Sequence, residues 1–254
     1  MIREYRVEDH PEIVEICKDI WEGNDYLPGI INSLIDDPTC YPTVLIDNNK
    51  IMSVVNLRLY SDKIGWSEAM RSHPDYRGKG YATKLQRSQL ELAKKLGCKE
   101  IWLSTAGDNT ATKIMLERLD FIEFSKFYLL HVSDPPDEFD KDKVKKINLK
   151  KAAEIIEILH FPHLLGVFKV IPVDSDYAKR CEDSLYSINN RSVILIGHEK
   201  QNDLVVGFNG HADDIDTAIS FASTFEHEEL KLFAPPNTGL DNEKAFRFMI
   251  QYLD

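Results

Sequence analysis

The chain has 254 residues, of which 43% are hydrophobic and 29% are charged. This length and apolar share predict one large or two small globular domains, and they exclude a disordered, coiled-coil or collagen-like chain. The formal net charge of −11 disfavours sequence-independent binding to phosphate backbones, so we expect no nucleic-acid partner.

Apolar runs and the spacing of cysteines and histidines bear on the localisation and metal content of the protein. The N-terminal residues lack the apolar segment of a signal peptide, and no apolar run approaches the roughly 20 residues that cross a bilayer. The cysteines are widely spaced and include no C-x-x-C pair: Cys17, Cys40, Cys98 and Cys181. His160 and His163 have no companion ligand at metal spacing. We therefore expect reduced thiols, no metal, no membrane partner and a cytoplasmic location.

The first half alternates strands with helices. We predict a strand over 2–7, a helix with Val14, Cys17 and Trp21 on one stripe, and a short helix through 30–35. Strands then follow at 42–47, 50–60 and 63–73, the first two joined by a turn at 47–49. The remaining elements of this half are a helix over 79–96, a strand over 99–105, a helix over 110–119 and a strand over 121–132. This order predicts an α/β fold, a mixed sheet with helices on its faces.

A proline-containing, charged stretch at 134–143 is the predicted linker between a first domain, 1–133, and a smaller C-terminal α/β domain, 144–254. The second domain is expected to contain a helix over 149–159, strands over 192–198, 204–209, 217–222 and 230–233, and a closing helix over 242–253. Its element order loosely repeats that of the first half, which makes it a candidate for a degenerate duplicate.

One glycine-rich turn carries the chemistry. It links the end of a strand to the start of the long helix, and its residues are Arg77, Gly78, Lys79, Gly80, Tyr81, Ala82 and Thr83. Glycines let the backbone approach a ligand closely, and the first N–H groups of a helix have no helical acceptor. With the helix dipole, this turn suits a pyrophosphate. Its spacing fits neither a Walker A loop nor a dinucleotide-binding fingerprint.

The run Arg77-Gly78-Lys79-Gly80-Tyr81-Ala82 resembles the R-x-x-G-x-G/A signature of the GCN5-related N-acetyltransferases, the GNAT superfamily. Asn109 and the segment 118–121 are similar to the N-x-x-A…G-F segment of that family. The resemblance covers about residues 1–132. It implies a GNAT-type twisted mixed sheet, acetyl-CoA as the donor and a primary amine as the acceptor.

The resemblance also implies cofactor-binding residues. Backbone groups of Met70 and Ser72 would meet the pantetheine arm, the amides of 77–83 would hold the pyrophosphate, and Asn109 would face the cofactor. An amide near Met70 would stabilise the oxyanion of the tetrahedral intermediate.

Acetyl transfer requires a neutral amine, and deprotonating an α-amine of pKa near 8 at neutral pH costs about 1.4 kcal/mol. We predict Glu68 as the general base because it leads into the glycine turn and shares strand parity with Met70 and Ser72. The alternative is an ion-paired strand glutamate without a catalytic role. Arg71, one residue out of parity with Glu68, is expected on the opposite face of the strand; the alternative is bidentate binding of a substrate carboxylate.

Two positions depart from the family pattern. Leu116 stands where many members have a tyrosine that protonates the leaving thiolate, and Asp120 replaces a glycine. The proton donor is therefore open: bulk water, Tyr128 or Tyr26, or none if the thiolate leaves unprotonated.

The segment Gly23-Asn24-Asp25-Tyr26-Leu27-Pro28 resembles the G-x-D-Y-L-P stretch of the histidine N-acetyltransferase branch. We predict Asp25 and Tyr26 as substrate-binding residues, through an ion pair and ring stacking; the alternative is a helix-capping Asp beside a packed Tyr. The leading hypothesis is an N-acetyltransferase for a small-molecule amine, with a free amino acid such as histidine first. The alternatives are a protein N-terminal or lysine acetyltransferase and a non-catalytic acyl-CoA sensor.

Overall fold

The computed structural model describes residues 1–159, 161–198, 202–240 and 243–253. The chain divides into two compact units. The first unit comprises Met1–Leu103, Ile114–Ile122 and Ile250–Asp254, and the second comprises Ser104–Lys113 and Glu123–Met249. The predicted linker at 134–143 thus lies within the second unit, and segments distant in sequence complete each unit.

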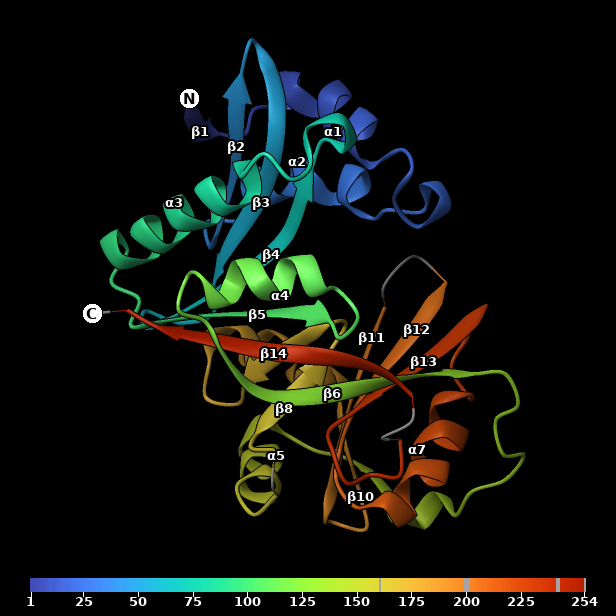
Figure 1. Cartoon of the computed structure of the whole chain (residues 1–254). Helices are drawn as coiled ribbons and strands as arrows, with labels where there is room; N and C mark the ends of the chain where they lie inside the picture. The colour runs from blue at the N-terminus through green and yellow to red at the C-terminus, as the bar shows by residue number, and fades with distance from the viewer. Residues whose placement is uncertain (160, 199–201, 241–242, 254) are drawn as a thin grey trace. The chain divides into compact units, whose positions relative to one another are not determined.

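The first unit is built on a mixed sheet (Figure 1). Its strands, in spatial order, are β1 (Ile2–Glu4), β2 (Cys40–Asp47), β3 (Lys50–Leu59), β4 (Ile64–Ser72) and β5 (Glu100–Ala106). Neighbours are antiparallel except β4 and β5, which run parallel. Asn48 and Asn49 have φ angles of 47° and 59°, as a tight hairpin turn between β2 and β3 requires.

Helices cover both faces of this sheet. Helices α1 (His10–Cys17) and α2 (Leu27–Asp36) pack on one face, and α3 (Tyr81–Lys95) packs on the other (Figure 1). Helix α1 buries Ile13, Ile16 and Cys17. The predicted stripe was wrong, because Val14 and Trp21 are exposed; the helix ends at Cys17, so Trp21 cannot continue its period.

A β-bulge interrupts β4. Asn56 of β3 lies opposite Glu68, whereas Val54 lies opposite Arg71, so that one residue of β3 faces both Ala69 and Met70. Ala69 has the left-handed φ of 59°. The extra residue shifts the alternation of side chains, which places Glu68 and Arg71 on the same face of the sheet.

The second unit contains most of the remaining strands. Their bounds are β6 (Ile122–Val132), β7 (Val144–Lys146), β8 (His163–Gly166), β9 (Lys169–Pro172), β10 (Leu185–Ile188), β11 (Ser192–His198), β12 (Asp203–Asn209), β13 (Glu229–Ala234) and β14 (Lys244–Tyr252). Within this unit the sheet order is β14-β6-β13-β12-β11-β10-β7, with β8 and β9 as a separate pair. The helices are α4 (Thr110–Glu117), whose residues both units share, α5 (Leu149–Ile156), α6 (Asp176–Arg180) and α7 (Ile215–Ala222).

Two predicted elements of this half were wrong. The predicted strand at 217–222 is part of helix α7, whose buried Ile215, Ala218, Ile219 and Ala222 follow the helical period. The predicted helix at 242–253 is strand β14, whose Phe246, Phe248 and Ile250 are buried at alternate positions. Asn242, the first residue of that predicted helix, lies outside the described residues. The predicted strands at 192–198 and 204–209 correspond to β11 and β12, which pair antiparallel.

The element order of the second half repeats that of the first. The elements β7, α5, α6, β10, β11, β12, α7 and β13 occur in the same order as β1, α1, α2, β2, β3, β4, α3 and β5, with the pair β8 and β9 inserted between α5 and α6. The β10–β11 turn also uses two left-handed asparagines, Asn189 and Asn190, each with a φ of 53°. The pair β12–β13 is parallel, like β4–β5.

Candidate active site

The glycine turn has the backbone conformation that its sequence predicts. Gly78 and Gly80 have φ angles of 77° and 81°, a region that residues with a Cβ rarely adopt. An added Cβ at either glycine would meet nothing within 4 Å. Backbone conformation, rather than crowding, therefore requires glycine here, and the turn is open to solvent.

The start of α3 leaves its amides available. Gly80 is the N-cap residue, and no side chain caps the helix. The first helical bond of this region is donated by Lys84 to the carbonyl of Gly80. Within the described chain no acceptor is recorded for the N–H groups of 78–83. Amides without an internal acceptor, together with the helix dipole, suit an anionic ligand such as a diphosphate.

Side chains of the turn stabilise it from outside. The Tyr81 hydroxyl donates to Asp47 at 2.6 Å, which ties the start of α3 to the end of β2. The Lys79 ammonium lies 4.6 Å from the centre of the Tyr76 ring. Arg77 is exposed. Positive charge thus flanks the open amides.

Strand β4 offers unpaired backbone next to the turn. Among the described residues, its register with β5 covers Ile64–Trp66 and Glu100–Trp102. Beyond Trp66, no strand in the part of the chain that the structure describes is paired with the backbone edge of β4 that faces away from β3. Met70 packs against the core beneath α3, and Ser72 shares a hydrogen bond of 3.1 Å with Ser53. The Met70 side chain packs in the core and the Ser72 hydroxyl is hydrogen-bonded to Ser53, so a cofactor would meet the backbone of these residues.

Asn109 belongs to the second unit and caps α4, because its Oδ1 accepts from the amide of Thr112 at 3.1 Å. Leu116 is fully buried, so it serves the core. Asp120 has the left-handed φ of 60° that its family counterpart, glycine, would adopt.

Glu68 lies in a polar network on the face covered by α2. Its Oε1 accepts from the Asn56 amide at 2.9 Å and from the Arg58 guanidinium at 3.0 Å. Arg58 also donates to Asp37, immediately after α2, at 2.7 Å. The Glu68 side chain is about one-tenth exposed. The network orients the carboxylate instead of leaving it mobile in solvent.

Asp25 and Arg71 form a buried bidentate pair. Arg71 Nε and Nη2 donate to the Asp25 carboxylate at 2.5 and 3.0 Å, and Nη1 donates to the Met70 carbonyl. Two predictions fail here. Arg71 shares the face of Glu68 because of the bulge, and Met70 and Ser72 lie on the opposite face from Glu68.

This pair changes the proton affinities nearby. Burial by itself would raise the pKa of Asp25, but the hydrogen bonds and charge of Arg71 outweigh burial and hold that pKa below its usual value. Burial, with the adjacent Asp25 charge, raises the pKa of the Cys17 thiol to about 12. Asp25 is therefore a charged partner of Arg71, and Cys17 is a neutral thiol.

Two aromatic rings cover the Arg71 guanidinium. The Trp21 and Tyr26 rings are stacked with centres 6.1 Å apart, and Arg71 Cζ lies 5.0 and 5.4 Å from their respective centres. Trp21 was not predicted as a site residue, and Arg71 was expected on the opposite face of β4. The sequence signal that could have indicated Trp21 is its short spacing from Asp25 and Tyr26 in one loop.

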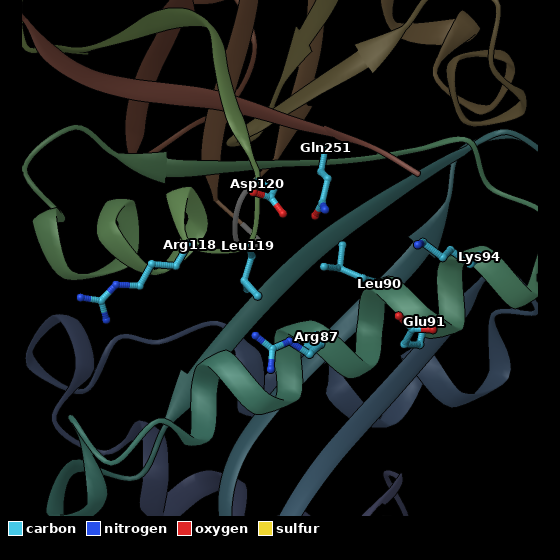
Figure 2. A pocket seen from close by; sticks show the side chains of 8 residues that line it. All are labelled: Arg87, Leu90, Glu91, Lys94, Arg118, Leu119, Asp120 and Gln251. Carbon is cyan, nitrogen blue, oxygen red and sulfur yellow. The ribbon is translucent and has the colours of Figure 1, made fainter. Parts of the chain in front are cut away.

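A groove of about 190 Å³ lies in the first unit, between α3 and the segment after α4 (Figure 2). Its lining residues are Arg87, Leu90, Glu91, Lys94, Arg118, Leu119, Asp120 and Gln251. Figure 2 shows the Arg87 and Arg118 side chains extending in the same direction from the two facing segments. Arg87 lies about 9 Å along the helix axis from Tyr81. These arginines, which sequence reasoning missed, extend the positive charge beyond the turn.

The described residues contain no cluster of three or more His, Cys, Asp or Glu that could hold a metal ion. His163 is half-buried among aromatic rings, and desolvation there lowers its pKa to about 4; His160 lies outside the described residues. All four cysteines are free. Among the helices in the described part of the chain, none is long and apolar enough to span a membrane.

Comparison with known proteins relates the first half of the chain, which carries the glycine turn, to acetyltransferases. A model of the acetyltransferase (GNAT) family matches residues 2–121. N-alpha-acetyltransferase 30 of Schizosaccharomyces pombe is 30% identical over 130 residues, 49% of this chain and 87% of that protein. An acetyltransferase of Sodalis glossinidius is 33% identical over 126 residues, 47% of this chain and 85% of its own.

The fold likeness extends over the whole chain. A GCN5-related N-acetyltransferase structure from Sphaerobacter thermophilus superposes with a TM-score of 0.63 at 12% identity, covering 100% of this chain and 95% of that one. The predicted GNAT-type mixed sheet is thereby confirmed. The chain belongs to the GNAT family and is an N-acetyltransferase, whose family cosubstrate is acetyl-CoA.

Proposed function

We propose that this enzyme acetylates the α-amine of a free amino acid, with histidine as the first candidate. The observation that carries the proposal is the common face of Glu68 and Arg71 produced by the β4 bulge. A carboxylate and a guanidinium on one face match the ammonium and the carboxylate of an amino acid.

The spacing supports this match. Glu68 and Arg71 occupy successive same-face positions of β4, about 7 Å apart along the strand. An amino acid presents its amine and its carboxylate from one carbon atom, and the two side chains can converge on it from this separation. Arg71 is anchored by Asp25, so its free N–H groups are held in place before a substrate arrives.

In the proposed reaction, the open amides of 78–83 hold the diphosphate of acetyl-CoA, which supplies the activated acetyl thioester. Glu68 attracts the ammonium and takes its proton, directly or through one water, so that the neutral amine can attack. Arg71 holds the acceptor carboxylate away from that base. Leu116 cannot donate a proton, but a thiolate with an ordinary pKa of about 8.5 can leave unprotonated.

Histidine is the first candidate because the Gly23–Pro28 segment resembles the histidine N-acetyltransferase branch and because aromatic rings adjoin Arg71. We place the reaction in the cytoplasm, in keeping with the free cysteines.

The test is steady-state release of coenzyme A with the twenty common amino acids as acceptors. We expect turnover of free amino acids, with histidine among the best. Binding of coenzyme A without turnover of any amine would instead support a sensor, and indifference to every amino acid would remove the substrate assignment.

A second candidate is acetylation of protein N-termini, which the name of the Schizosaccharomyces pombe relative favours. An N-terminal amine lies beside a neutral peptide bond rather than a carboxylate, so this activity would leave Arg71 without an anionic partner in the substrate. Peptides with free N-termini, assayed beside the amino acids, separate the two candidates.

A further inference from the structure

Trp21 is held in an unfavourable backbone conformation. Its φ and ψ are both 48°, and the next two residues, Glu22 and Gly23, also have positive φ angles of 58° and 85°. The left-handed region disfavours residues that carry a Cβ, and bulky ones most of all. Folding tolerates such strain where another requirement sets the conformation.

Core packing is not that requirement. The Trp21 side chain is 55% exposed, although tryptophan is among the largest apolar side chains. Trp66 and Trp102, in contrast, are buried in the sheet. The loop therefore adopts an unfavourable backbone conformation in which the Trp21 side chain is exposed and not buried.

The displayed ring has specific neighbours. It stacks on Tyr26 at 6.1 Å with an interplanar angle of 24°, and the Arg71 guanidinium lies 5.0 Å from its centre. We call Trp21 and Tyr26 the aromatic shelf. The shelf adjoins the guanidinium that Asp25 fixes by two hydrogen bonds. It thus offers apolar ring surface next to a fixed positive charge.

We propose that Trp21 determines acceptor specificity, by stacking the planar side chain of an aromatic or heteroaromatic amino acid whose carboxylate is held by Arg71. This inference rests on the proposed amino-acid acetylation. Ring stacking favours planar side chains over branched or short ones, because flat faces bury area without losing many rotamers.

The experiment compares kcat/KM for histidine and phenylalanine with kcat/KM for alanine and leucine, in the full chain with saturating acetyl-CoA. In Trp21→Ala, we expect the preference for ring-bearing acceptors to fall by about three- to tenfold. Trp21→Phe, which keeps a ring, should retain most of the preference. Val14→Ala, another exposed apolar side chain of the first unit, should not change it.

Two readouts separate specificity from damage. The KM for acetyl-CoA and the thermal midpoint should stay the same in the Trp21 variants. An equal loss of kcat/KM for all acceptors, or an unchanged preference for ring-bearing acceptors, would contradict the specificity role of Trp21. Neither result would contradict amino-acid acetylation itself. Absence of amino-acid turnover by the unaltered protein would overturn both.

Discussion

Glu68 accepts hydrogen bonds from Asn56 and Arg58. A substitution can separate this hydrogen-bonding role from the proposed role of Glu68 as the general base. Glu68→Gln keeps an oxygen for both donors but loses the negative charge. We expect kcat/KM at neutral pH to fall by about 100-fold, the usual contribution of a positioned general base. The deficit should shrink as the pH rises, because solution itself then supplies a growing share of the neutral α-amine.

A kcat/KM profile from about pH 6.5 to about pH 9.5 measures this effect. Asn56→Ala is the matched control, because it removes one donor to Glu68 and leaves the carboxylate. A deficit in Glu68→Gln that stays constant over the whole range would mean that Glu68 orients residues and moves no proton.

The Asp25–Arg71 pair makes stability depend on pH. The folded-state pKa of Asp25 lies below its unfolded value, so the extra stability is fully present at neutral pH and is lost as the pH falls below about 4. Asp25→Asn should cost about 3 kcal/mol at neutral pH, since it leaves a buried guanidinium without its counter-charge.

Urea unfolding at several pH values checks this prediction. The gap in the free energy of unfolding between the unaltered protein and Asp25→Asn should narrow as the pH falls below about 4. The exposed Asp62→Asn provides the comparison. A gap independent of pH would show that the charge of Asp25 contributes nothing to folding.

Helix α3 and its preceding turn act as one element in cofactor binding. Gly80→Ala places a Cβ on a left-handed residue, which costs about 1–2 kcal/mol, although no protein atom would clash with it. The turn can relieve this strain only by moving its open amides. We therefore expect the KM for acetyl-CoA to rise about tenfold, with little change in the acceptor KM.

Gly29→Ala in α2 is the control, because Gly29 has ordinary backbone angles and open space around it. Direct binding of coenzyme A by calorimetry gives the same comparison without turnover. Equal affinities of Gly80→Ala and Gly29→Ala would argue against a diphosphate on these amides.

Local signals made the glycine turn, α3 and the Asn48–Asn49 hairpin predictable, since each depends on neighbours in sequence. The side of the sheet on which the Arg71 side chain lies was not predictable from local sequence. It depends on the bulge, in which one residue of β3 lies opposite both Ala69 and Met70, and this pairing is a property of two strands. The predictions for α7 and β14 were wrong for a simpler reason. Their short apolar runs fit both the helical and the strand period, so tertiary burial, not local sequence, decides between helix and strand.

At the scale of the whole molecule, the repeated element order raises the question of a second cofactor site. Helix α7 corresponds to α3 in that order, but Asp214 is its N-cap residue. The buried Asp214 carboxylate accepts from Arg191 at 2.9 Å and from Ser192 at 2.6 Å. An internal carboxylate thus lies where α3 has open glycine backbone, and it would repel a diphosphate.

We therefore expect one coenzyme A per chain. Isothermal titration of the full chain should give a stoichiometry near one, and Gly80→Ala should weaken that single transition. A second binding event that survives Gly80→Ala would assign cofactor binding to the C-terminal half.

The central claim is that Arg71 recognises the carboxylate of the acceptor while Glu68 deprotonates its amine. Histidine and histamine differ only in that carboxylate, so their kcat/KM ratio in the unaltered enzyme tests the claim most directly. We predict that histidine is favoured by about 10- to 100-fold, the usual worth of a charge-assisted hydrogen bond. Equal turnover of histamine would contradict the account.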